Sequence, residues 1–363
     1  MIKYIAIVVA LTGFVVPYGI SYPLAYTPVL VMICVAGIFL ERKSLPTSLI
    51  WTMAIGVSLV TVLSFWKENA FTDYVAPISS LFILSYVSVH KYLKKYKWEK
   101  VVVYLCFLGL IVQFVVFTEE RRFVSSIGDP NFAGYIALTL FIFSFYRGIK
   151  VGVIFGLVSV FILLSRTYMF SILIFILAYQ FRSPLYSLIK SIKLNSFISL
   201  FLVTNIVLLM LSLLVVSRFE FGDIDRRQAG QNRLLRLTDG SLYIRLYQNA
   251  RVFDMLWQGN EAAWVGLGGD VEDKYVVQGS RLKGQPPHNS LFHSVIVYGF
   301  IFTLYYLYSV SYIFGGWLNA RNVPILIAYS SYAANLHALL LNWWILALAL
   351  LFLVSNDEPR VKR

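Results

Sequence analysis

Charged side chains are scarce in this sequence. They make up 13% of its 363 residues, whereas soluble domains contain about a quarter. Hydrophobic residues make up 59%, and the mean hydropathy is +0.73. A helix needs roughly 20 mostly apolar residues to cross a bilayer, and such stretches recur from Ile5 to Val354. The composition argues against a soluble domain and predicts that most of the chain lies in lipid.

Cysteine, metal-ligand patterns and internal repeats are also lacking. The two cysteines, Cys34 and Cys106, both fall inside hydrophobic stretches, which excludes a disulfide framework and a metal-thiolate site. Asp, Glu and His do not form any metal-ligand spacing, so we predict neither a metal nor another cofactor. Many transporters are built from two related halves, and the absence of an internal repeat lowers the expectation of a transporter.

The predicted fold class is all-α: a polytopic transmembrane protein of about twelve spans. The expected organisation is spans one to nine in 1–217, a large extracytoplasmic loop with short helices in 218–288, spans ten to twelve in 289–354, and a cytoplasmic tail in 355–363. The first span is interpreted as retained, because it follows a single lysine and lacks an obvious small-residue cleavage site. The spans are expected near 4–20, 22–40, 47–65, 74–90, 101–118, 132–146, 151–165, 167–181, 197–217, 289–314, 323–337 and 339–354.

Positive charge is distributed unevenly along the chain. With the amino terminus inside and alternate sides thereafter, more than half of the 31 lysines and arginines fall in cytoplasmic segments, whose net charge equals the +13 of the whole chain. By the positive-inside rule both termini are cytoplasmic. The excess charge is therefore an orientation signal and not a nucleic-acid-binding surface. The cytoplasmic set is Lys3, Arg42, Lys43, Lys91, Lys94, Lys95, Lys97, Lys100, Arg147, Lys150, Arg182, Lys190, Lys193, Arg321, Arg360, Lys362 and Arg363.

The outside turn 118–131 and the loop 218–287 are the two chemically unusual regions. In the loop, a turn at 239–241 and apolar residues at helical spacing after it predict an amphipathic helix from about 241 to 258, with Arg245 held toward the protein. The stretch 264–269 is rich in glycine. A phosphate cradle would need a strand before it and a helix after it, so a turn that lets the loop fold back is the favoured interpretation.

Three residues place a cationic or titratable group at the outer boundary: Arg166, Arg245 and His288. Arg166 interrupts two apolar segments, and it either reaches lipid headgroups by snorkelling or binds a substrate. His288 precedes Asn289, which can satisfy the first turn of the next helix. His288 is either a polar helix-start residue or a general base, since histidine's ordinary pKa of about 6.5 lets it take a proton near neutral pH.

These residue types suit one reaction. A lipid diphosphate presents two phosphates at the membrane surface, and arginine grips phosphate oxygens in a bidentate fork. Attack by a sugar hydroxyl needs a base on the other side of the scissile bond. Two arginines and one histidine, Arg166, Arg245 and His288, supply both needs without a metal, so these residue types are compatible with such a catalytic site.

Further polar residues are candidates for substrate binding. Asn289 follows the proposed base. The loop arginines could line a path for diphosphate or anionic glycan, or they could form a solvated face balanced by nearby acidic residues. The loop candidates are Arg218, Arg226 and Arg227.

On these residues the sequence resembles the bacterial O-antigen ligase and O-antigen polymerase superfamily. The similar pieces are the Ser165-Arg166 pair at a span junction, Arg245 in the loop helix followed by Trp257 and a glycine-rich turn, and His288-Asn289 followed after nine residues by Gly299. Asp129-Pro130-Asn131, in the outside turn, is similar to a further element of that family.

The resemblance implies an inverting, metal-independent membrane glycosyltransferase that acts on the periplasmic side of the bacterial inner membrane. His288 would deprotonate the acceptor hydroxyl, while Arg166 and Arg245 would hold the undecaprenyl diphosphate. The expected partners are an undecaprenyl-diphosphate-linked glycan donor, a lipid-linked repeat unit or lipid A core as acceptor, membrane lipids and a separate chain-length regulator.

Several functions remain open at this point. The favoured one is a polysaccharide polymerase, and its nearest rival is the ligase, which shares the donor chemistry and differs only in its acceptor. A lipid-linked oligosaccharide flippase or other transporter predicts charged groups within the spans, yet the first five spans contain essentially none in their centres. A non-catalytic scaffold protein predicts that substitutions of the three candidate catalytic residues are harmless.

Overall fold

A computed structural model describes the chain over residues 5, 22–41, 45–66, 74–90, 93–116, 118–119, 122–123, 130–191, 197–217, 249, 252, 255–268, 288–315, 318–335 and 345–356. The described part is helical apart from one antiparallel pair of two-residue strands, β1 (Thr118–Glu119) and β2 (Arg122–Phe123). The predicted all-α class is therefore confirmed. The helices are α2 (Tyr22–Glu41), α3 (Thr47–Trp66), α4 (Val75–Ser88), α5 (Trp98–Val116), α6 (Pro130–Arg147), α7 (Lys150–Leu163), α8 (Arg166–Gln180), α9 (Arg182–Ser191), α10 (Phe197–Ser217), α12 (Glu261–Val265), α14 (Ser290–Tyr298), α15 (Phe300–Phe314), α16 (Val323–Ala333) and α17 (Ile345–Ser355).

Most of the predicted spans correspond to single helices, and one does not. α3 and α10 begin and end within a residue of the predicted 47–65 and 197–217. The prediction of one helix over 289–314 is wrong, because α14 and α15 are separated at Gly299. The predicted span 4–20 and loop helix 241–258 fall largely outside the described residues.

Helix length supports fewer membrane spans than the hydropathy of the sequence predicts. Within the described residues, Thr47–Ser64 of α3 is long and apolar enough to cross a membrane, and the bent pair α8 and α9, counted together, would be a second such segment. Other apolar helices, including α4, α7 and α15, are 10–17 residues long.

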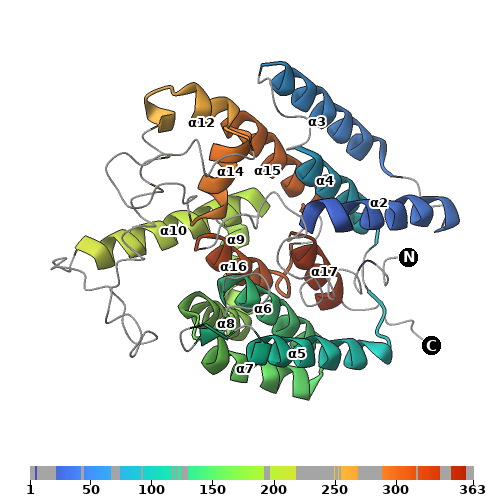
Figure 1. Ribbon diagram of the computed structural model, residues 1–363, viewed down its shortest axis with the longest axis vertical. Helices are drawn as coiled ribbons and strands as arrows, with labels where there is room; N and C mark the ends of the chain where they lie inside the picture. The colour runs from blue at the N-terminus through green and yellow to red at the C-terminus, as the bar shows by residue number, and fades with distance from the viewer. Residues whose placement is uncertain are drawn as a thin grey trace.

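The helices form two connected groups around α16 (Figure 1). α6 packs against α7 and α8, with α5 beside them, and α16 packs against α8 on one side and α10 on the other. α4 contacts α2, α15 and α17, while α3 lies at the edge of the molecule against α4 and α15. The short α12 packs against α14 and α15. α16 therefore packs against α8, which carries Arg166, and also against α17, which contacts α4.

The packed helices expose apolar side chains on the outside and bury polar side chains between them. Phe39 on α2 and Phe161 on α7 are 77% and 74% exposed, and further large apolar side chains are exposed along α3, α5 and α8. In contrast, Ser144 and Ser171 are fully buried and Asn205 is 5% exposed. Large exposed apolar areas are rare on soluble monomers and mark contact with lipid or with another protein.

Polar contacts join several helix ends at one end of the molecule. The Tyr146 hydroxyl, near the end of α6, donates to the Arg321 carbonyl oxygen before α16 (2.6 Å). The Arg321 guanidinium donates to the Ser355 carbonyl oxygen at the end of α17 (3.2 Å). At the end of α8, the Arg182 guanidinium lies 4.3 Å from the centre of the Tyr179 ring. We call this region the basic end, and its described basic residues include Lys94, Lys95, Arg147, Arg182 and Arg321.

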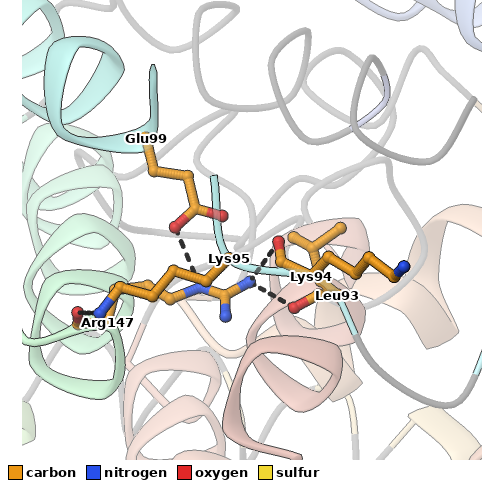
Figure 2. A network of polar contacts seen from close by, with 5 residues as sticks. All are labelled: Leu93, Lys94, Lys95, Glu99 and Arg147. Carbon is orange, nitrogen blue, oxygen red and sulfur yellow. Dashed lines mark hydrogen bonds and ion pairs between the residues drawn. The ribbon is translucent and has the colours of Figure 1, made fainter. Parts of the chain in front are cut away.

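Figure 2 shows a buried network at the basic end. The Arg147 guanidinium lies 3.2 Å from a carboxylate oxygen of Glu99 and donates to the carbonyl oxygens of Leu93 (2.6 Å) and Lys94 (3.3 Å). The Lys95 ammonium donates to the Arg147 carbonyl oxygen (2.8 Å). Glu99 and Arg147 are 1% and 8% exposed. The network ties the segment before α5 to the turn between α6 and α7.

Candidate active site

A two-residue turn between α7 and α8 places Arg166. Leu164 adopts a left-handed conformation (φ 48°), which is unusual for a bulky residue. Ser165 caps α8, because its hydroxyl oxygen accepts a hydrogen bond from the backbone N–H of Tyr168 (3.3 Å). Arg166 is the first residue of α8 and is half-buried. The helix junction lies where the sequence predicts it.

The position of Arg166 is unfavourable for a purely structural cation. A helix N-terminus carries roughly half a positive charge, so a cation in the first turn costs a few tenths to about 1 kcal/mol. The left-handed Leu164 adds strain on the order of 1–3 kcal/mol. Strain of this kind clusters at functional sites. Together, the guanidinium and the N-terminus of α8 attract an anion.

Asn131, in the first turn of α6, connects α8 to α16. Its side-chain oxygen accepts a hydrogen bond from the Ser165 hydroxyl (2.9 Å), and its backbone carbonyl oxygen accepts one from the Tyr332 hydroxyl (2.6 Å). Gly134 permits this approach, because a Cβ there would overlap the Tyr332 hydroxyl. Asn131 thereby fixes the turn that presents Arg166.

His288 lies directly before α14, and Asn289 caps this helix. The Asn289 side-chain oxygen accepts hydrogen bonds from the N–H groups of Leu291 (2.9 Å) and Phe292 (3.3 Å). Its amide nitrogen donates to the Ala334 carbonyl oxygen, just past α16 (3.3 Å). The prediction that Asn289 satisfies the first turn of its helix is confirmed. His288 is half-buried beside this cap.

Three helix N-termini are thus connected to the last turn of α16. α6 reaches Tyr332 through Asn131, α8 reaches Asn131 through Ser165, and α14 reaches Ala334 through Asn289. α6 runs from this region to Arg147, and α16 runs to it from Arg321, so the region is opposite the basic end. We call it the junction end and define it by Asn131, Ser165, Arg166, His288, Asn289 and Tyr332.

A backbone crossing holds the far end of α14. Gly266 and Gly299 have positive φ values of 89° and 84°, and a Cβ on either glycine would overlap the backbone of the other segment. The N–H groups of the two residues after Gly266 donate hydrogen bonds of 2.7 and 2.9 Å to carbonyl oxygens in α14. The glycine-rich stretch therefore folds back onto the break between α14 and α15.

Part of the predicted site lies in the described residues. Arg166, His288 and Asn289 lie at the junction end. The remaining predicted site residues lie outside the described part of the chain: Arg245, Arg218, Arg226 and Arg227. Within the described residues, no group of three or more His, Cys, Asp or Glu side chains could hold a metal ion.

Two features of the site were not found from the sequence. Tyr332 meets Asn131 across 201 positions of sequence, and nothing in the local pattern around Tyr332 marks it. The crossing of Gly266 and Gly299 also joins distant segments. Its only sequence signal is the presence of a glycine in each segment.

The described residues define a helical protein with an apolar outer surface and a junction end that presents an arginine and a histidine at helix N-termini. Comparison with protein-family models, with curated proteins and with solved structures found no match to this chain.

Proposed function

We propose that this chain is a polytopic glycosyltransferase of the O-antigen polymerase and ligase type, with about twelve spans. In this proposal it resides in the bacterial inner membrane with both termini in the cytoplasm and its active site on the periplasmic side. The apolar exposed faces of α2, α3, α5 and α7, together with the buried serine and asparagine side chains, support placement in lipid.

The contacts between helix ends support the proposed orientation. At the basic end they join segments that the charge distribution assigns to the cytoplasm, from 93–99 to Arg147 and Arg321. At the junction end they join segments assigned to the periplasm. A chain that alternates sides brings these sets of residues to opposite ends.

The observation that carries the catalytic proposal is the connection of α6, α8 and α14 to the last turn of α16. Arg166 and His288 each lie at the N-terminus of a helix that is linked to this turn, which supports a shared site. Helix N-termini and arginine both favour a bound diphosphate. The half-buried His288, directly before α14, is suited to accept the proton of an incoming hydroxyl.

In the proposed reaction, the acceptor sugar hydroxyl gives its proton to His288 as its oxygen attacks the anomeric carbon of the donor. The bond between that carbon and the phosphate oxygen breaks with inversion, and the electron pair leaves with undecaprenyl diphosphate. Arg166, and Arg245 from the loop, hold the diphosphate and neutralise the charge it gains. Loop residues Arg218, Arg226 and Arg227 and the cap Asn289 are proposed to guide the substrates.

The proposed acceptor is a new lipid-linked repeat unit, which makes the protein a polymerase. A separate chain-length regulator is the proposed partner. A ligase would use the same donor and the same two residues, with lipid A core as its acceptor. A polymerase and a ligase are therefore distinguished by the glycan product that they form.

Complementation of cells that lack the native gene tests the proposal. Wild-type protein should restore long glycan chains, and His288→Ala should leave single repeats on lipid A core. His293→Ala is the matched control, since it removes the histidine at the fourth position of α14, one turn beyond the Asn289 cap. Membrane levels of all variants are compared by immunoblot.

The same experiment separates the rival functions. Full-length chains that accumulate on the lipid carrier in the His288→Ala strain would make the protein a ligase. Movement of lipid-linked units across the membrane without a new glycosidic bond would make it a transporter. Equal chain lengths with wild type and His288→Ala would remove His288 from the mechanism and favour a scaffold.

A further inference from the structure

α9 turns sharply away from α8. The two helices are bent by 83° where they meet, at Phe181. α9 has 10 residues and is therefore about 15 Å long, too short to cross a hydrocarbon core of about 30 Å. Because α8 starts at the junction end with Arg166, a membrane-crossing α8 leaves α9 nearly parallel to the membrane plane.

The side chains of α9 fall into three sectors around the helix axis. The inner face contacts the protein, with Ile189 only 5% exposed and Leu185 and Tyr186 half-buried against the core. On one side of this face lies an apolar flank formed by Phe181, Pro184 and Leu188. On the other side lies a polar flank, whose exposed residues are Ser183, Ser187 and Lys190.

The apolar flank is open and continuous with other exposed apolar groups. Phe181 and Leu188 are both 56% exposed, and Leu177, one turn before Phe181 on α8, is 51% exposed. A helix with one face on the protein, one apolar flank and one polar flank fits a boundary between acyl chains and water.

The positive charge of α9 suits an anionic surface. The helix contains Arg182 and Lys190 and no acidic residue. The Arg182 guanidinium donates to the Tyr179 carbonyl oxygen (3.0 Å) and lies over the Tyr179 ring, which holds it at the end of α8 near the other cations of the basic end. Basic residues beside apolar ones bind anionic lipid headgroups.

We propose that α9 lies in the plane of the cytoplasmic leaflet, with its apolar flank among the acyl chains and its polar flank in water, and that Arg182 and Lys190 bind anionic headgroups. The inference depends on the membrane placement proposed above and is independent of glycosyl transfer.

Spin-label accessibility at adjacent positions tests this orientation. Leu188→Cys and Ser187→Cys each carry a nitroxide, one on the apolar flank and one on the polar flank, in full-length protein reconstituted in nanodiscs of phosphatidylcholine and phosphatidylglycerol. Wild-type protein controls for background labelling, since Cys34 and Cys106 are buried. We expect the label at 188 to be accessible to oxygen and protected from a water-soluble nickel chelate, and the label at 187 to show the reverse.

Three results would overturn the proposal. Equal nickel accessibility at both positions would mean that α9 stands in water, and equal oxygen accessibility would mean that α9 is inside the bilayer as part of a broken span. Immobile labels at 188 with dipolar coupling between molecules would mean that a second copy of the chain covers the flank.

Lipid composition tests the charge part of the proposal. Replacing phosphatidylglycerol by phosphatidylcholine should increase nickel accessibility at 188, and Lys190→Glu should abolish the dependence on lipid charge. Ser183→Glu is the control, because it adds an acid to the polar flank without removing a cation. If lipid charge does not change the nickel accessibility of the label at 188 in protein that retains Lys190, headgroup binding is contradicted. Glycosyl transfer measured on the same nanodiscs reports separately on the catalytic proposal.

Discussion

Arg166 combines three features: a strained residue, Leu164, two positions before it, a capped helix start and a cation at the positive end of a helix dipole. The cap and the following apolar run are local signals, so the sequence was sufficient to place Arg166 at a helix start. The same holds for His288, which precedes the capping Asn289. What the sequence could not supply is their common attachment to α16, because no local pattern encodes contacts between residues so far apart.

Substitution of Arg166 separates a catalytic role from a structural one. Arg166→Gln should lower glycosyl transfer by about 10²–10³-fold, the usual effect of removing one group that stabilises developing charge. Arg166→Lys keeps the charge and loses the bidentate fork, so its activity should be intermediate. Removing a cation from the start of α8 should leave the Tm in detergent unchanged or slightly raised. A Tm that falls in parallel with activity would contradict this account.

Tyr332 is expected to position the turn that presents Arg166. Tyr332→Phe removes the hydroxyl that donates to Asn131, which should cost about 0.5–1.5 kcal/mol of unfolding free energy and lower glycosyl transfer roughly tenfold, as loss of a supporting contact does. Tyr146→Phe is the control, because it removes a hydroxyl-to-carbonyl bond of the same 2.6 Å length at the basic end. We expect a similar loss of stability with activity retained. Equal activity losses in the two variants would mean that the effect is general instability.

At the scale of helices, the most informative difference from the prediction is in 289–314, which was expected to be one span and contains two helices. The apolar pattern continues across Gly299, and a single glycine within an apolar run does not end a predicted helix. The break arises from the crossing with Gly266, a contact that only the folded chain contains. Helices such as α3 and α10, which end at polar segments, were predicted closely for the opposite reason, since their ends are encoded locally.

Gly299→Ala tests the crossing. We expect a large loss of stability, because the new Cβ needs both an unfavourable positive φ and space that the Gly266 segment occupies. Gly148→Ala is the matched control, with a φ of 70° and nothing within 4 Å of its added Cβ. Its cost should be limited to about 1 kcal/mol of backbone strain. Thermal unfolding in detergent measures both, and equal Tm values for the two variants would argue against a crossing that restricts α14.

The Glu99 and Arg147 pair is expected to stabilise the basic end as a unit. Burial raises the pKa of the Glu99 carboxyl, and the Arg147 charge opposes this rise. Arg147→Met should cost about 3–5 kcal/mol, because it leaves a buried carboxylate without its partner. Adding Glu99→Gln should recover part of the loss, which a double-mutant cycle of unfolding free energies measures. Purely additive losses would mean that the two side chains do not interact.

At the scale of the whole molecule, composition and charge predicted an all-helical chain with helix ends on alternate sides. Charge at the ends of apolar segments is a signal that needs no knowledge of packing, so the sequence is sufficient to predict alternating sides, and this alternation stays a prediction. The sequence could not reveal which helices neighbour α16, since apolar helices of similar composition pack in many arrangements. It ended the predicted span at 181, close to the end of α8, but it did not predict that the following residues form the separate helix α9, whose Ile189 packs on the core.

The central claim is that the junction end forms a glycosidic bond with His288 as the base. The most direct measurement uses purified protein in nanodiscs with undecaprenyl-diphosphate-linked repeat units as donor and acceptor, and follows both lengthened lipid-linked glycan and released undecaprenyl diphosphate. Wild type and His293→Ala should form both products at similar rates. The rate of His288→Ala should be lower by about 10²–10⁴-fold, the usual contribution of a general base. Undiminished product from His288→Ala would contradict the proposed role of His288.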